Sequence, residues 1–118
     1  MNITDFYDYC LALKGVTEHF PFDEDILVFK VGGKMFVLSS LSEWEKEKAS
    51  VNVKCDPEEA IELRERYQGV TPGYHMSKKH WNTVFFHQDV TDREVLDMIR
   101  NSYELVFASL PKKVREQI

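Results

Sequence analysis

The sequence predicts an α+β fold, a two-layer sandwich in which helices pack on one face of a mainly antiparallel sheet. Three observations predict it. The Gly32-Gly33 dipeptide separates two apolar stretches, ILVFKV and KMFVLSS, which is the pattern of a tight β-hairpin. Helix-start signals at 56–59 and 91–94 open two helical patterns later in the chain. Consecutive strands are close enough in the sequence to pair in antiparallel fashion.

Length and composition limit the protein to a few classes. With 118 residues the chain is long enough for one core and too short for two, so we expect one domain over residues 1–118. A content of 43% hydrophobic and 30% charged residues excludes a disordered segment. Apolar runs stay far below the roughly 18 residues of a membrane span, and the acidic amino terminus lacks a secretory signal. We therefore expect a cytoplasmic monomer that makes no membrane contact.

A helix is expected at the amino terminus. Asn2 or Thr4 caps it and Gly15 ends it. The apolar side chains on its inner face, spaced by four and three residues, are Phe6, Cys10 and Leu13. Residues 16–25 are then expected to form a loop, because Pro21 and the three acids that follow it are turn material.

The hairpin stretch alternates its side chains between two faces. One face takes Ile26, Val28 and Lys30, and the other takes Leu27, Phe29 and Val31. We expect helices to cover one of these faces. A charged connection at 42–50 follows, with Trp44 as a lid over the sheet edge, and then a short strand at 50–55.

Two later helices have clear boundaries. Asp56 caps the first, Pro57 opens its first turn, and Gly69 ends it. Its inward residues are Ala60, Leu63 and Tyr67. Thr91 and Glu94 form a capping box at the start of the second helix. The apolar stripe of that helix, which Pro111 terminates, consists of Val95, Ile99, Tyr103, Val106 and Leu110.

The stretch 70–87 concentrates the unusual chemistry. No Asp or Glu occurs between Arg66 and Gln88, an interval that holds three of the four histidines. Arg66, Lys78 and Lys79 supply three positive charges here. Without them the chain has 12 basic residues against 20 acidic ones, so this stretch is basic and the remainder of the chain is acidic. Residues 74–82 are expected to form a loop that enters a strand at 83–87.

Two interpretations of this loop stay open. In the first, Lys78 and Lys79 neutralise phosphates while flat side chains stack on bases. Those flat side chains are Tyr74, His75 and Trp81, and hydrogen bonds come from Ser77 and Asn82. In the second, Trp81 packs into the core and anchors the loop, and the lysines are merely solvated. A pI near 5.3 means that any nucleic-acid binding must come from a local patch.

Neither a metal site nor an enzyme signature is present in the sequence. His75, His80 and His87 are separated by five and seven residues, which matches no ligand spacing of helical or finger-type sites. There is no glycine-rich phosphate loop, no nucleophile elbow and no H-E-x-x-H motif. Cys10 lies on an apolar helix face and Cys55 at a strand end, and neither setting activates a thiol. We expect no catalytic residue, no metal ligand and no cofactor.

Two blocks, FKVGGKMF at 29–36 and GYHMSKKHW at 73–81, resemble the MmcQ/YjbR family of small bacterial proteins, and the resemblance covers nearly the whole chain. It implies a fold similar to that of frataxin and CyaY, with helices at both termini packed on an antiparallel sheet. It also implies DNA binding through two hairpin-like wings. Carried over to this sequence, the candidate wing contacts are Lys30, Lys34, Lys78, Lys79, His80 and Trp81. The net charge of −5 departs from that expectation, because a duplex binder is usually basic.

Three hypotheses follow. The first is a non-enzymatic protein that binds duplex DNA through the turn at 32–33 and the loop. The second is a protein-interaction or small-ligand module whose pocket the loop closes. Its candidate pocket residues are Tyr74, His75 and Asn82, with Trp81 beside them. The third is frataxin-like metal binding by the acids near the amino terminus. A buried Trp81 with a cavity beside the histidines favours the second hypothesis, and an exposed lysine wing favours the first.

Overall fold

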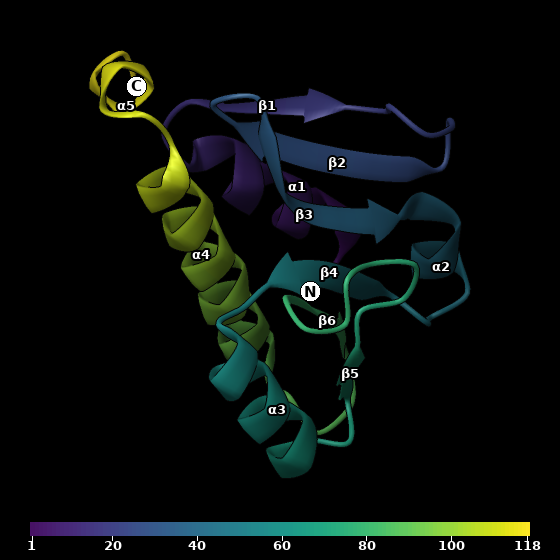
Figure 1. Ribbon diagram of the computed structural model, residues 1–118. Coiled ribbons are helices and arrows are strands. Elements are labelled where there is room, and N and C mark those ends of the chain that lie inside the picture. Colours follow the sequence, from purple (N-terminus) through teal and green to yellow (C-terminus); the bar gives the residue numbers. More distant parts are fainter.

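The computed structural model describes all residues, 1–118, and contains one six-stranded antiparallel sheet with the strand order β1-β2-β3-β4-β6-β5 (Figure 1). The strands are β1 (Val16–His19), β2 (Ile26–Val31), β3 (Lys34–Ser40), β4 (Ser50–Lys54), β5 (Val70–Pro72) and β6 (Trp81–Phe85). The helices are α1 (Ile3–Ala12), α2 (Leu41–Glu45), α3 (Pro57–Arg66), α4 (Asp92–Ser109) and α5 (Lys112–Glu116). The α+β class predicted from the sequence is confirmed. No helix is both long and apolar enough to cross a bilayer.

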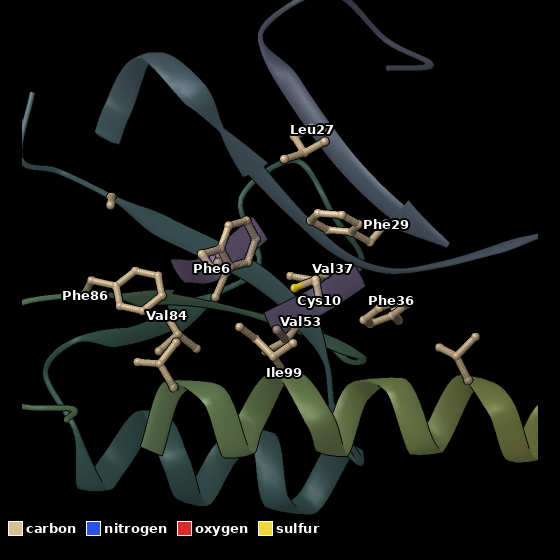
Figure 2. Close-up of a cluster of buried hydrophobic side chains, with 14 of the residues drawn as sticks. Phe6, Cys10, Leu27, Phe29, Phe36, Val37, Val53, Val84, Phe86 and Ile99 are labelled. Carbon is tan, nitrogen blue, oxygen red and sulfur yellow. The ribbon is translucent and has the colours of Figure 1, made fainter. Parts of the chain in front are cut away.

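The hydrophobic core lies between one face of the sheet and the helices α1 and α4. Figure 2 shows Phe6 and Cys10 of α1, Phe29 of β2 and Ile99 of α4 converging there. The inward alternation predicted for β2 is confirmed, since the core contains Leu27, Phe29 and Val31. The other strands supply residues in the same alternating manner, among them Val37, Val51, Val53 and Val84.

Local capping signals place the two core helices as predicted. The side chain of Asn2 accepts a hydrogen bond from the backbone N–H of Asp5, and the Asp5 carboxylate accepts one from the N–H of Asn2. Thr91 and Glu94 make the same reciprocal pair at the start of α4. These capping boxes satisfy backbone donors that have no partner within the helix, and so they define where each helix begins.

Five segments differ from the expectation. Residues 16–19 form β1 rather than loop, because they pair with β2 in register from Val16 opposite Val31. The charged connection contains the short helix α2. Residues 70–72 form β5, which pairs with β6. The last strand begins at Trp81, two residues before the expected start, and α5 extends the chain beyond Pro111.

Trp44 packs against the core more closely than a lid over the sheet edge would. Its ring stacks on Phe6 with centroids 5.5 Å apart and lies 5.0 Å from the ring of Phe86. Its indole Nε1 donates a hydrogen bond to Ser39 Oγ at 2.8 Å. The apolar body of the ring is thus covered while its polar atom has a partner.

The turn between β2 and β3 requires two glycines, each for a different reason. Gly32 and Gly33 have φ angles of 57° and 81°, as the hairpin prediction expected. A Cβ at Gly32 would lie 2.5 Å from Leu110 Cδ1, whereas a Cβ at Gly33 would meet nothing within 4 Å. Gly32 therefore allows α4 to end against the hairpin turn, while Gly33 supplies conformational freedom alone.

We expect Gly32→Ala to destabilise the protein more than Gly33→Ala. Both substitutions place alanine at a positive φ, which costs about 1 kcal/mol. Gly32→Ala adds the contact with Leu110, so its total loss should reach about 2–3 kcal/mol. Urea unfolding of both variants measures the difference. Equal losses would mean that Leu110 moves aside without cost.

The carboxylate of Asp89 holds the connection between α3 and β5. It accepts hydrogen bonds from the backbone N–H groups of Gln68 at 2.7 Å and Gly69 at 2.8 Å. These two bonds, and above all the one from Gln68, lower the pKa of the Asp89 carboxyl below its ordinary value.

Asp89→Asn is expected to lower stability at neutral pH and to have no effect in acid. Because the folded-state pKa lies below the unfolded one, the stabilisation by Asp89 is complete above the unfolded pKa, which is about 4. It is lost as the pH falls through the folded-state value. Unfolding curves between pH 7 and pH 2 should therefore converge for wild type and Asp89→Asn. Asp8→Asn, at an exposed position on α1, is the control. A difference that is independent of pH would contradict the assignment.

Candidate functional site

The second face of the sheet carries only a small apolar cluster. Val28, Leu38 and Trp81 form it, with Ile26, Met35 and Met76 packed against them. In Figure 1 the loop between β5 and β6 passes in front of β4, whereas α1 lies behind the sheet. We call this second face the open face.

The loop at 73–80 is closed on itself by hydrogen bonds. The N–H of Gly73 donates to the carbonyl oxygen of Trp81 at 2.9 Å, and the N–H of Trp81 donates to Ser77 at 2.9 Å. The ammonium group of Lys78 donates to the carbonyl oxygen of Gly73 at 2.9 Å. A Cβ at Gly73 would lie 2.8 Å from Trp81 Cβ, so the closure depends on a residue without a side chain at this position.

Arg64 of α3 connects this loop to the helix layer. Its Nε donates to Asn82 Oδ1 at 2.7 Å, and its Nη2 donates to the carbonyl oxygen of Lys78. Asn82 in turn donates to the carbonyl oxygen of Ala60 at 3.3 Å. Only 1% of Asn82 is exposed. Helix, loop and strand are thus joined by one polar network, which is buried at Asn82 and reaches the surface at Lys78.

A groove with a volume of about 760 Å³ lies on the open face beside this loop. Its floor consists of residues from β2, β3, β4 and β6, including Ile26, Leu38, Ser50, Asn52 and Phe85. One wall is the segment before β2, with Phe22 and Asp23, and another is the loop, with Tyr74, His75 and Met76. Glu43 of α2 and Lys48 lie at its margin.

The strand period explains why β4 contributes polar side chains to the floor. Ala49, Val51 and Val53 belong to the core on the helix side. Ser50 and Asn52, which alternate with them, therefore point to the open face. Both line the groove, and Lys48, just before the strand, lines it too.

Asn52 and Thr83 tie the loop to the floor. They lie opposite each other on β4 and β6, and Thr83 Oγ1 donates to Asn52 Oδ1. Thr83 Oγ1 also accepts the N–H of Tyr74 at 3.0 Å, and Asn52 Nδ2 donates to the Tyr74 carbonyl oxygen at 3.3 Å. The backbone of Tyr74 is thereby fixed over the strands.

Two aromatic rings stand exposed at the groove. Phe22 is 62% exposed and Tyr74 is 69% exposed. The ring of His75 lies 4.0 Å from that of Tyr74, and His75 has a positive φ of 57°. A positive φ is uncommon outside glycine, and such positions cluster at functional sites.

The charged groups of the groove differ in whether they already have partners. Asp23 Oδ1 accepts the N–H groups of Asp25 at 2.8 Å and Ile26 at 2.9 Å. Glu43 Oε1 lies 3.6 Å from Lys46 Nζ. Lys48 takes part in none of the four ion pairs of the chain.

The structure separates the residues expected in the pocket. Tyr74 and His75 line the groove, whereas Asn82 points to the helix side and lines a different, smaller cavity between α3 and α4. Trp81 is 9% exposed and belongs to the open-face cluster beneath the loop. This packing agrees with the anchoring interpretation.

The expected wing residues are also divided. Lys78, Lys79 and His80 are all exposed on the same loop, but the Lys78 ammonium already donates a hydrogen bond to the Gly73 carbonyl oxygen. Lys30 is half-buried in β2 and Lys34 is exposed at the hairpin turn.

The cavity between α3 and α4 has a volume of about 250 Å³ and includes Cys55. Burial raises the pKa of the Cys55 thiol to about 11 and raises that of Cys10 further. A thiol in such surroundings is a poor nucleophile. No three His, Cys, Asp or Glu side chains lie close enough together to hold a metal ion.

Sequence reasoning missed most of the groove. The exposed Phe22, the polar side of β4 and the bridging Arg64 were not expected at a site. The alternation of Lys48, Ser50 and Asn52 with buried residues was the available signal for the floor.

Comparisons with known proteins agree with the sequence motifs. A family model described as YjbR matches residues 11–105. The protein YbdF of Escherichia coli O157:H7 is 34% identical over 108 residues, which cover 92% of this chain and 86% of that protein. The protein YjbR of Escherichia coli K12 is 29% identical over 116 residues, which cover 98% of this chain and 96% of that protein.

Solved structures extend the likeness to three dimensions. The crystal structure of a Deinococcus radiodurans protein with a DUF419 domain matches with a TM-score of 0.89 and 34% identity, covering 98% of this chain and 86% of that one. A Pseudomonas syringae protein matches with a TM-score of 0.75 and 25% identity, covering 90% of this chain and 99% of that one. The family predicted from residues 29–36 and 73–81 is confirmed, and this chain belongs to the YjbR family.

Proposed function

We propose that this protein is a binding module that takes a small molecule into the groove on its open face. The observation that carries the proposal is the groove of about 760 Å³ between Phe22 and Tyr74, with His75 beside it and Trp81 buried under the loop. Of the three hypotheses, this arrangement favours the small-ligand module.

The composition of the groove supports a small ligand. Ligand sites are commonly hollows of about 300–1,000 Å³ with apolar walls and a few convergent polar groups. Here the apolar side chains include Ile26, Leu38 and Phe85, and the polar ones include Ser50 and Asn52. Segments on more than one side wall the groove, which suits a compact ligand better than an extended chain.

Fragment binding followed by amide NMR tests this proposal. A library of small aromatic, aliphatic and polar compounds should contain ligands that shift the amide signals of Ser50, Tyr74 and His75. Ser50→Trp fills the groove with a large side chain and should abolish these shifts. Ile61→Trp is the matched control, because Ile61 is 53% exposed on α3 and does not line the groove. A library that shifts no groove signal, or shifts that survive in Ser50→Trp, would overturn the proposal.

Duplex DNA binding is the second candidate, and the resemblance to a family regarded as DNA-binding supports it. One structural observation also favours it, since Lys34 and Lys79 are exposed and take part in none of the four ion pairs. Tryptophan fluorescence during titration with duplex DNA tests it at several salt concentrations. Binding should weaken with salt and with the double substitution Lys34→Ala and Lys79→Ala. Lys78 is unsuitable for this purpose, because its ammonium group closes the loop.

A frataxin-like arrangement of the fold and metal binding by the acids near the amino terminus stay predictions. The groups in question include Asp5, Asp8 and Glu18. The Glu18 carboxylate accepts a hydrogen bond from the Tyr7 hydroxyl at 2.6 Å. A calorimetric titration with ferrous iron or cobalt tests metal binding, and heat that disappears when these acids are neutralised would support it.

A further inference from the structure

We infer that the ligand of the groove is a planar aromatic molecule with one anionic group, and that Phe22, Tyr74 and Lys48 select it. The inference rests on the proposed function and adds the chemical class of the ligand. Two independent features carry it: the exposed aromatic side chains and the arrangement of free hydrogen-bond donors.

The aromatic part follows from Phe22 and Tyr74. Phe22 precedes β2 and Tyr74 precedes β6, and these two strands are separated in the sheet by β3 and β4. The two rings therefore approach the groove from different sides. When a ligand covers large aromatic side chains that have more than half of their surface in water, the free energy of the complex falls, because apolar surface is removed from water. An aromatic ligand suits such side chains, because rings stack face to face or edge to face.

The rigid backbone under Tyr74 strengthens this point. Its N–H and carbonyl oxygen are both bound, to Thr83 and Asn52 respectively. The loop is therefore held in place before a ligand arrives, and little conformational entropy is lost on binding.

The anionic part follows from the donors that remain free. Lys48 and Ser50 both line the groove, and the Lys48 ammonium has no carboxylate within 4.0 Å. No hydrogen bond occupies the Ser50 hydroxyl or the His75 ring, and both line the groove. A carboxylate can accept hydrogen bonds from an ammonium, a hydroxyl and an imidazole N–H at once.

The two acids of the groove are already engaged. Asp23 accepts two backbone N–H groups and Glu43 is paired with Lys46. Their negative charge is therefore partly balanced within the protein, whereas the positive charge of Lys48 has no paired carboxylate. This difference favours an anionic ligand over a cationic one.

Three matched naphthalene probes test the inference: 2-naphthoate, 2-naphthylmethanol and 2-naphthylmethylammonium. Their dissociation constants are measured by amide NMR titration at low salt. We expect 2-naphthoate to bind most tightly. Phe22→Ala and Tyr74→Ala should each weaken all three probes by about tenfold, because each substitution removes an aromatic contact of the groove.

Lys48→Ala should weaken 2-naphthoate by about five- to tenfold and leave 2-naphthylmethanol unchanged. Lys112→Ala on α5 is the control, because it makes the same change in net charge at a residue that does not line the groove. A general effect of net charge would weaken 2-naphthoate equally in both variants, and this result would overturn the role of Lys48.

Failure of the inference can be told apart from failure of the proposed function. Tighter binding of the alcohol or the ammonium probe, still abolished by Ser50→Trp, would overturn the anionic class and leave the groove as a ligand site. Groove shifts produced only by aliphatic fragments would overturn the aromatic class. An absence of shifts with every compound would overturn both.

Discussion

Phe6→Ala should lower the free energy of unfolding by about 3–5 kcal/mol, as expected for the loss of a fully buried phenylalanine. Phe6 is 0% exposed. Its ring lies edge-on to Phe29 with centroids 5.7 Å apart and stacks on Trp44 at 5.5 Å. The substitution thus removes the contact that joins α1 to both β2 and α2, and leaves a cavity in the core.

Urea unfolding followed by far-ultraviolet circular dichroism measures this loss. Domains of this size have total stabilities of about 5–15 kcal/mol, so Phe6→Ala alone can bring the protein close to unfolding. Phe6→Leu keeps an apolar side chain and should lose less. Leu105→Ala is the control on the outer side of α4, where Leu105 is 37% exposed. A loss for Phe6→Ala no greater than that for Leu105→Ala would contradict the central place of Phe6 in the core.

The three longer helices, α1, α3 and α4, could be predicted because their signals are local. Asn2 with Asp5 and Thr91 with Glu94 each satisfy donors within four residues, so the sequence alone contains both partners. The hairpin was predictable for the same reason, since Gly32 and Gly33 provide the positive φ angles at the turn itself.

The edge strands could not be predicted in this way. β1 contains Thr17 and Glu18, both exposed, and its strand conformation is stabilised by pairing with β2. β5 has three residues and ends in Pro72, a sequence that is also turn material. For both strands the hydrogen-bond partner lies in another segment, so tertiary pairing outweighs local preference.

The groove illustrates the same limit for function. The sequence singled out Lys78 and Trp81, but the roles of such residues depend on partners that the sequence does not identify. The Lys78 ammonium binds the Gly73 carbonyl oxygen within the loop, and Arg64, which lies 14 residues before Lys78, binds the Lys78 carbonyl oxygen from α3. A lysine that closes a loop and a lysine that contacts phosphate have the same sequence signature, and only the geometry distinguishes them.

Asn82→Ala is expected to cost about 2–3 kcal/mol of stability, through a different mechanism from that of Phe6→Ala. The amide of Asn82 accepts from Arg64 Nε at 2.7 Å and donates to the carbonyl oxygen of Ala60. Its removal leaves one partly buried guanidinium N–H without its partner and takes away the second hydrogen bond of the Ala60 carbonyl oxygen, which lies inside α3. Buried groups that lose their partners cost more than the hydrogen bonds themselves contribute.

A double-mutant cycle with Arg64→Ala isolates this network. If Asn82 acts through Arg64, the double variant should be more stable than the sum of the single losses predicts, by about 0.5–3 kcal/mol. Amide hydrogen exchange gives a second readout, because the N–H groups of Gly73 and Trp81 close the loop that Arg64 holds. Both amides should exchange faster in Arg64→Ala and in Asn82→Ala. Additive losses with unchanged exchange would mean that the loop holds its shape without α3, and the wall of the groove would then depend on Asn52 and Thr83 instead.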